Sequence, residues 1–143
     1  MTKHSNFCLV SIMGLAVFGF SGSALAEARL NCSDTSNMNQ SEMTICSYQD
    51  FGDADAELNK IWPKVKIYAK RGDNELGEGE MTGAGMLVKA QRSWLVYRDA
   101  QCELEGFAAR GGSLQPMLVA GCKADLTNQR VKAFIVLLEA DGQ

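Results

Sequence analysis

Two pairs of carboxylates stand close enough in the sequence to raise the question of acid–base chemistry. Asp53 is followed two residues later by Asp55, and Glu103 in the same way by Glu105. Paired carboxyl groups hydrolyse glycosidic bonds when they face each other across a substrate cleft. Glu103 and Glu105 point to different faces of a helix, and a small helical domain has little interior for such a cleft. These pairs therefore do not indicate catalysis.

Nucleophilic catalysis and His-based metal sites are also unsupported. His4, the only histidine, lies in an N-terminal segment that we expect to be removed, which leaves no imidazole for a triad, zinc or iron. Ser93 and Ser113 then lack a base, because Lys89 stands at no established nucleophile–base spacing from Ser93. The glycine-rich residues 71–85 carry acidic side chains and lack the Lys-Ser/Thr end of a phosphate loop. We expect neither an enzyme nor a bound cofactor.

Residues 1–26 have the order of a secretory signal peptide. A basic end precedes the apolar residues 8–20 and the small-residue site Ala24-Leu25-Ala26. The apolar stretch is shorter than the roughly 20 residues of a membrane-spanning helix, which disfavours the alternative of an uncleaved anchor. Cleavage after Ala26 leaves 117 residues (143 − 26), a length typical of one domain over residues 27–143. We expect a periplasmic or secreted protein with no membrane insertion.

The charge balance restricts the class of partner. Removal of Lys3 from the 14 basic residues leaves 13 against 17 acidic ones, a net charge of −4. Without a basic excess the chain is not expected to bind nucleic acid. A mildly acidic surface is better suited to a basic protein.

The cysteines of the expected mature chain predict two disulfides. They are even in number, as is typical of exported domains: Cys32, Cys46, Cys102 and Cys122. Three pairings are possible, and the division into an early and a late pair favours Cys32–Cys46 and Cys102–Cys122. Zinc binding requires closer Cys-x-x-Cys spacing. A lipidated cysteine would follow the cleavage site directly, and Cys32 lies too far beyond it.

The periodicity of the chain predicts helices. Asn39 stands three residues before Glu42, the spacing of a capping box, so a first helix is expected to begin near Gln40. Its apolar positions recur every three or four residues, at Phe51, Ala54, Leu58, Ile61, Val65 and Tyr68.

Two further helical regions follow a loop over residues 71–85. The second helix is expected over residues 86–107, and the third after a turn in which Ser113 is a possible cap and Pro116 lies in the first turn. Thr127 is a candidate cap for a further segment that carries Arg130. The predicted fold is all-α, a small antiparallel bundle of three to four helices stapled by two disulfides.

The second helix has an unusual mixture of residues on one face. Apolar Leu87, Ala90, Trp94 and Tyr97 share that face with Gln91, Arg98 and Gln101. Burying the charge of Arg98 without a partner would cost on the order of several kcal/mol. Either Arg98 pairs inside with Asp55 or Glu57 of the first helix, or Trp94, Arg98 and Asp99 form a patch that binds another protein.

The motifs of the chain resemble those of the LprI-type lysozyme inhibitor family. The resemblance covers nearly all of the expected mature chain and rests on Asp55, Glu57-Leu58-Asn59, the run Gln91-Arg92-x-Trp94-Leu95-x-Tyr97-Arg98-Asp99-Ala100-x-Cys102, the turn Gly111-Gly112-Ser113, and Cys122 with Thr127 and Arg130.

The resemblance implies a proteinaceous inhibitor that binds lysozyme and protects peptidoglycan. It implies a structural or partner-binding role for the motif residues Asp55, Asn59, Gln91, Arg92, Trp94, Tyr97, Arg98, Asp99, Gly112, Ser113 and Arg130. The lipidation cysteine of the inhibitor that gives the family its name is absent here. Alternatives are an envelope structural or stress-related interaction module and, less favoured, a small hydrolase; the oligomeric state does not follow from the sequence.

Overall fold

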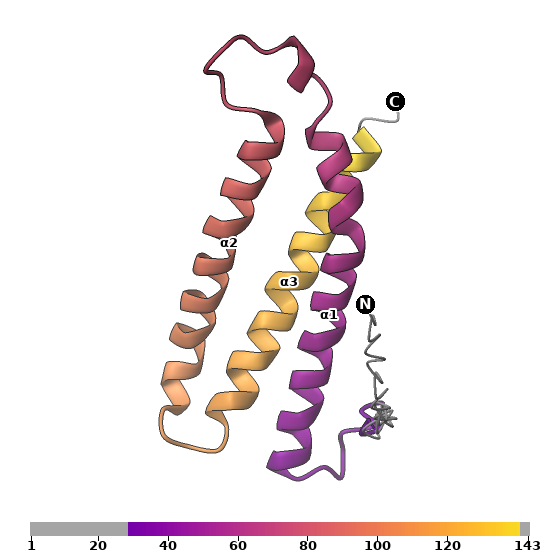
Figure 1. Ribbon diagram of the computed structural model, residues 1–143. Coiled ribbons are helices and arrows are strands. Elements are labelled where there is room, and N and C mark those ends of the chain that lie inside the picture. Colours follow the sequence, from indigo (N-terminus) through magenta and orange to yellow (C-terminus); the bar gives the residue numbers. More distant parts are fainter. Residues whose placement is uncertain (1–28, 141–143) are drawn as a thin grey trace, which may run out of the picture.

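The computed structural model describes residues 29–140, and these residues form an antiparallel three-helix bundle (Figure 1). The elements in chain order are α1 (Gln40–Ala69), the 3-10 turn η1 (Asp73–Glu75), α2 (Gly83–Gly106), the 3-10 turn η2 (Phe107–Ala109) and α3 (Gln115–Ala140). The described part of the chain contains no strand, so the all-α prediction is confirmed. The predicted leader, with His4 and Cys8, lies outside the described residues.

Helix α1 begins where the sequence predicts it. The side chain of Asn39 accepts hydrogen bonds from the backbone amides of Ser41 (2.9 Å) and Glu42 (3.1 Å), and the Glu42 carboxylate accepts one from the amide of Asn39 (2.8 Å). This reciprocal capping box satisfies amides that have no partner within the helix. The helix then continues through Pro63 to Ala69 without interruption.

Helix α2 begins earlier than predicted, so the expectation of a loop over residues 71–85 is wrong for residues 83–85. Asp73 opens a 3-10 turn, and Gly83 already belongs to the helix, which Thr82 caps by accepting a hydrogen bond from the Gly85 amide at 3.0 Å. The Asp73 carboxylate accepts from the Gly83 amide at 2.7 Å. A Cβ atom on Gly83 would collide with the carbonyl oxygen of Ala69, so glycine permits the close approach of α2 to the end of α1.

Helix α3 is continuous, which corrects the prediction of a second segment capped by Thr127. Thr127 lies in the middle of α3 and has no exposed surface. Pro116 occupies the first turn of α3, as predicted. The turn before α3 contains Gly111 with a φ of +80°, a left-handed conformation that glycine adopts without steric cost.

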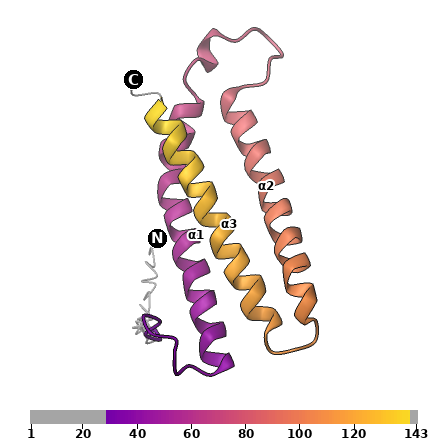
Figure 2. The ribbon, with the colours of Figure 1, turned by 180° about the vertical axis from the view of Figure 1, so that it is seen from behind.

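The helices pack unequally. Helices α1 and α3 lie side by side, while α2 packs mainly on α3 and has fewer contacts with α1, as seen from both sides in Figures 1 and 2. The centre of the core consists of Leu58, Val65, Leu87 and Phe134, with Ile61, Trp62, Ala69, Trp94, Val131 and Leu138 packed around it. Burial of these side chains is the main stabilising contribution to such a bundle.

Both predicted disulfides are present. Cys102–Cys122 joins the end of α2 to α3 inside the bundle, where the two residues are 0% and 7% exposed. Cys32–Cys46 ties the segment before α1 to the first turns of that helix. The four cysteines are therefore not free to act as zinc ligands.

Within residues 29–140, none of the helices combines the length and the apolar character needed to cross a bilayer.

Candidate functional site

A groove between α1 and α2 brings together four of the predicted site residues. It has a volume of about 320 Å³. Helix α1 contributes Asp55, Leu58, Asn59 and Trp62, and α2 contributes Val88, Gln91, Arg92 and Leu95. Two pairs of motif residues thus meet from two helices: Asp55 and Asn59 of α1, and Gln91 and Arg92 of α2. The two pairs lie more than 30 positions apart in the sequence. We call this surface the α1–α2 groove.

The α1–α2 groove combines an apolar floor with a polar rim. Leu58 in the floor is 4% exposed, whereas Arg92 on the rim is exposed. The side-chain amide of Asn59 donates to the carboxylate of Asp55 at 2.9 Å. No ion pair holds Arg92 within the described residues, so its guanidinium is available to an acceptor from outside. Such a surface can bind another protein by apolar contact and charge-assisted hydrogen bonds.

Gln91 connects the α1–α2 groove to the interior. Its side-chain oxygen accepts a hydrogen bond from Nε of Arg130 at 3.1 Å. The Arg130 guanidinium lies 5.7 Å from the ring centre of Trp94 and 4.4 Å from that of Phe134. Partial burial lowers the pKa of Arg130 from its ordinary value by penalising the charged form. Arg130 therefore holds the Gln91 side chain in place from the interior side of the groove.

Arg98 is paired inside the bundle, but not with the carboxylates expected from the sequence. It is 7% exposed; Nε donates to the Asp99 carboxylate at 3.0 Å, and Nη1 donates to the Thr127 hydroxyl at 3.4 Å. The expected partners are engaged elsewhere, since Asp55 binds Asn59 and Glu57 binds Lys60 at 3.1 Å. The prediction of an Asp55 or Glu57 partner is wrong because Arg98 pairs with Asp99 of its own helix and Thr127 of α3, and meets the Phe51 ring of α1 instead of a carboxylate.

Two arginines, the buried Arg98 and the partly buried Arg130, alternate with aromatic rings through the bundle. The Arg98 guanidinium lies 5.1 Å from the ring centre of Phe51 and 5.2 Å from that of Trp94, and the rings of Trp62 and Phe134 are 5.9 Å apart. Cation–π contacts are stronger when they are desolvated. We call this row the cation–aromatic stack; its members, from all three helices, are Phe51, Arg98, Trp94, Arg130, Phe134 and Trp62.

The remaining predicted site residues lie outside the α1–α2 groove. Tyr97 is 55% exposed on α2. The Asp99 carboxylate binds Arg98 and lies 3.6 Å from Nζ of Lys123. Gly112 and Ser113 are exposed in the turn that joins η2 to α3. The structure therefore does not gather the whole motif into one site.

A second groove, between α1 and α3, is acidic and was not predicted. It has a volume of about 380 Å³ and includes the carboxylates of Asp50, Asp53, Glu57 and Asp125. The first three stand at positions i, i+3 and i+7, which places them on one face of a helix. That spacing was visible in the sequence, but the contribution of Asp125 depends on how α3 packs. We call this surface the acidic groove.

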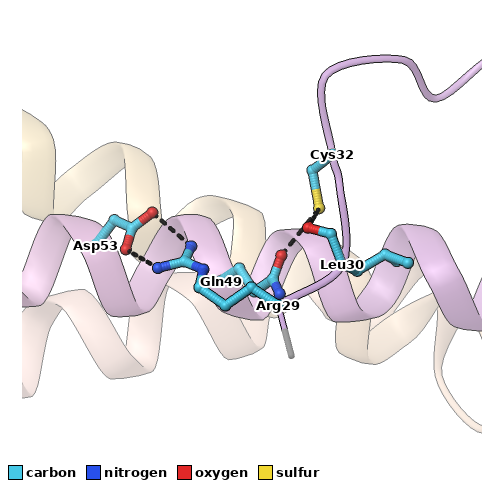
Figure 3. A network of polar contacts seen from close by, with 5 residues as sticks. All are labelled: Arg29, Leu30, Cys32, Gln49 and Asp53. Carbon is cyan, nitrogen blue, oxygen red and sulfur yellow. Dashed lines mark hydrogen bonds and ion pairs between the residues drawn. The ribbon is translucent and has the colours of Figure 1, made fainter. Parts of the chain in front are cut away.

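The segment before α1 is fastened to the helix beside the acidic groove (Figure 3). The Arg29 guanidinium binds both carboxylate oxygens of Asp53, at 2.6 and 2.7 Å. The hydrogen bond from Arg29 lowers the pKa of Asp53. The Gln49 side chain, in the amide orientation that satisfies both partners, donates to the Leu30 carbonyl at 3.1 Å and accepts from its amide at 2.9 Å. With the Cys32–Cys46 disulfide, these contacts form a clasp.

The carboxylate pairs considered for catalysis are not arranged across a cleft. Asp53 is bound to Arg29 and Asp55 to Asn59, whereas Glu105 accepts a hydrogen bond from Gln101 at 3.2 Å. These contacts hold neighbouring surface groups together.

Comparison with known proteins agrees with this geometry. The chain is 48% identical over 106 residues to the protein named "Uncharacterized protein R02472" of Rhizobium meliloti (strain 1021), an alignment that covers 72% of this chain and 76% of the relative. No solved structure matches the chain. The family model described as "Lysozyme inhibitor LprI" matches residues 32–134, a range that includes both disulfides, α1, α2 and most of α3. The chain therefore belongs to the LprI lysozyme inhibitor family.

Proposed function

We propose that this protein binds a lysozyme outside the cytoplasm and inhibits it, and that it thereby protects peptidoglycan. The observation that carries the proposal is the family match over residues 32–134. Two disulfides support an oxidising location, since such bridges persist in the periplasm and outside the cell. The sequence-derived leader over residues 1–26 is consistent with the same location.

The α1–α2 groove is the surface we assign to the docked lysozyme. Arg92 and Asp55 offer one cation and one carboxylate beside an apolar floor that includes Leu58. Central contacts of this kind determine how slowly a complex dissociates. A hydrolytic role has less support, because Asp53, Asp55 and Glu105 are bound to other surface groups and the two carboxylate pairs do not face each other across a cleft.

The acidic groove has a different part in this proposal. Asp50 and Asp125 add negative charge between α1 and α3, and a basic lysozyme is attracted to charge of that sign. Long-range attraction speeds encounter and weakens as salt screens it. We therefore expect the acidic groove to raise the association rate and the α1–α2 groove to lower the dissociation rate.

A peptidoglycan lysis assay with the purified protein tests the proposal directly. Equimolar protein is expected to slow lysis by at least one type of lysozyme. Arg92→Glu is expected to raise the dissociation rate by about tenfold or more, as loss of a central contact does. Lys132→Glu makes the same charge change at an exposed position of α3 outside both grooves and is expected to have little effect on dissociation. Undiminished lysis with every lysozyme type would refute the proposed function.

The steering role is tested by the double variant Asp50→Asn and Asp125→Asn. We expect slower association in low salt, no change in dissociation, and convergence with the unmodified protein as salt is raised. An unchanged association rate would mean that the acidic groove has no part in binding, even if inhibition itself is observed.

A further inference from the structure

One side of α2 carries residues spaced like the seam of a coiled coil. The intervals between them alternate between four and three over three heptads, a mean period of 3.5 residues. At this period a row of side chains stays directed at one partner helix. We call this row the α2 seam; its members are Met86, Ala90, Ser93, Tyr97, Ala100 and Leu104 of α2, together with Phe107, the C-cap residue at which η2 begins.

The α2 seam is exposed within residues 29–140. Its four large members, Met86, Tyr97, Leu104 and Phe107, are 54%, 55%, 67% and 57% exposed, and its small members are exposed too. The buried residues of α2 are on other sides of the helix, at Leu87, Arg98, Cys102 and Gly106. Single exposed apolar side chains are normal, but four large ones in one row mark an interaction surface. None of the buried residues of α2 belongs to the α2 seam, so the packing of the bundle does not account for its heptad spacing.

We propose that the α2 seam pairs with the α2 seam of a second copy of this chain, antiparallel and related by a two-fold axis. The flanking charges specify this occupant. Lys89 and Glu103 each directly precede a seam residue and therefore lie on the same flank of the seam, at equivalent heptad positions. Neither has an ion pair within the described part of its own chain. This inference goes beyond inhibition and does not depend on it.

Antiparallel pairing satisfies both charges. The two helices then run in opposite directions, so Lys89 of one copy lies beside Glu103 of the other, and the two-fold axis produces this pair twice. In a parallel pair the same flank would face Leu87, Trp94 and Gln101, which carry no charge. Opposite charges across a seam set partner choice and orientation. The charge pattern therefore selects the antiparallel arrangement.

The sizes of the seam residues fit this register. With Lys89 beside Glu103 of the second copy, Ser93 lies opposite Tyr97 and so leaves space for its ring. Two faces of this size bury on the order of 1,000 Å² in total, at the low end of specific interfaces. We therefore expect a reversible dimer with a micromolar Kd.

Sedimentation equilibrium of the purified protein over a range of concentrations tests the dimer. The unmodified protein is expected to pass from monomer to dimer, and Leu104→Glu is expected to raise the Kd about 100-fold, because the charge enters the seam from both copies. Ile67→Glu is the matched control: Ile67 is 66% exposed on α1, outside the α2 seam, and its replacement is expected to leave the Kd unchanged. A protein that stays monomeric at every concentration, or a dimer indifferent to Leu104→Glu, overturns the proposal.

A charge exchange tests the orientation. Lys89→Glu and Glu103→Lys are each expected to weaken the dimer about tenfold, and the double exchange to restore it. The two residues are 14 positions apart, about 21 Å along one helix, so the rescue cannot arise within one chain. Weakening without rescue overturns the antiparallel register. If the unmodified protein is monomeric at every concentration and Leu104→Glu abolishes lysozyme inhibition, the α2 seam binds lysozyme. That result would overturn the homodimer.

Discussion

Arg98 of α2 and Thr127 of α3 meet in the interior of the bundle, where Nη1 of the arginine donates to the threonine hydroxyl at 3.4 Å. Thr127 has no exposed surface, and its hydroxyl accepts this hydrogen bond from a residue of the neighbouring helix. A buried hydroxyl that loses its partner keeps the cost of desolvation. We infer that Arg98, the buried arginine of the Gln91–Cys102 run, stabilises the fold.

Arg98→Ala is expected to lower the free energy of unfolding by about 3 kcal/mol, since it leaves Thr127 unpaired and opens a cavity beside the Trp94 ring. Urea unfolding followed by circular dichroism measures the loss. Arg92→Ala, at an exposed position of the same helix, is expected to stay within about 0.5 kcal/mol of the unmodified protein. Unchanged stability of Arg98→Ala would contradict the interior role.

Two glycines in helices are expected to respond to alanine in opposite directions. A Cβ atom on Gly106 would collide with Cγ2 of Val119, so Gly106→Ala is expected to cost about 1–3 kcal/mol by overpacking. Gly52 has no neighbouring atom within 4 Å of the Cβ position, so Gly52→Ala is expected to stabilise α1 by about 0.5–1 kcal/mol. Thermal unfolding of both variants measures the difference. Recovery of stability by Val119→Ala in the Gly106→Ala protein would identify the collision as the cause.

The two disulfides are expected to differ in their effect on unfolding. Replacing Cys102 and Cys122 by alanine removes a bridge inside the bundle and is expected to cost about 3 kcal/mol. Replacing Cys32 and Cys46 frees the clasp, which can detach while the helices stay packed. We expect faster proteolysis of residues 29–39 and a smaller loss of global stability. Equal losses in urea unfolding would show that the clasp unfolds together with the bundle.

The clasp is expected to weaken in acid. Arg29 lowers the pKa of Asp53 below its ordinary value of 3.8, so the contribution of this pair is complete above pH 3.8 and is lost as the pH falls through the lower folded pKa. Both side chains are exposed, which keeps the contribution small. Nuclear magnetic resonance titration of Asp53 is expected to show its pKa rise in Arg29→Gln. A pKa that does not move would mean that the pair does not persist in solution.

Local features of the fold were predictable from the sequence. The start of α1 depends on Asn39 and Glu42, which interact within one turn, and so the spacing alone identified it. The order of the cysteines favoured, among three possible pairings, the two disulfides that are present. The motif residues pointed to the family, and four of them do meet in the α1–α2 groove.

Features that depend on packing were not predictable. Gly83 begins α2 with its backbone against the carbonyl oxygen of Ala69, a close approach that periodicity cannot reveal. Thr127 has the side chain of a helix cap, yet it is buried in mid-helix as a partner for Arg98. The pairing of Arg98 with Thr127 depended on how α2 packs on α3. In each case, a contact between residues distant in sequence overrides the local preference.

The lateral pairing of α1 with α3 governs when the chain can acquire its structure. Helix α1 is synthesised first, but the surface it packs against belongs to the last helix, beyond the whole of α2. A nascent chain that stops before residue 115 lacks the main counterpart for the apolar stripe of α1, because α2 contributes few of its contacts. Loop-closure entropy must be overcome before such distant contacts form. The contacts between α1 and α3 therefore cannot form until the last helix has been synthesised, so the three-helix packing is completed only at the end of the chain.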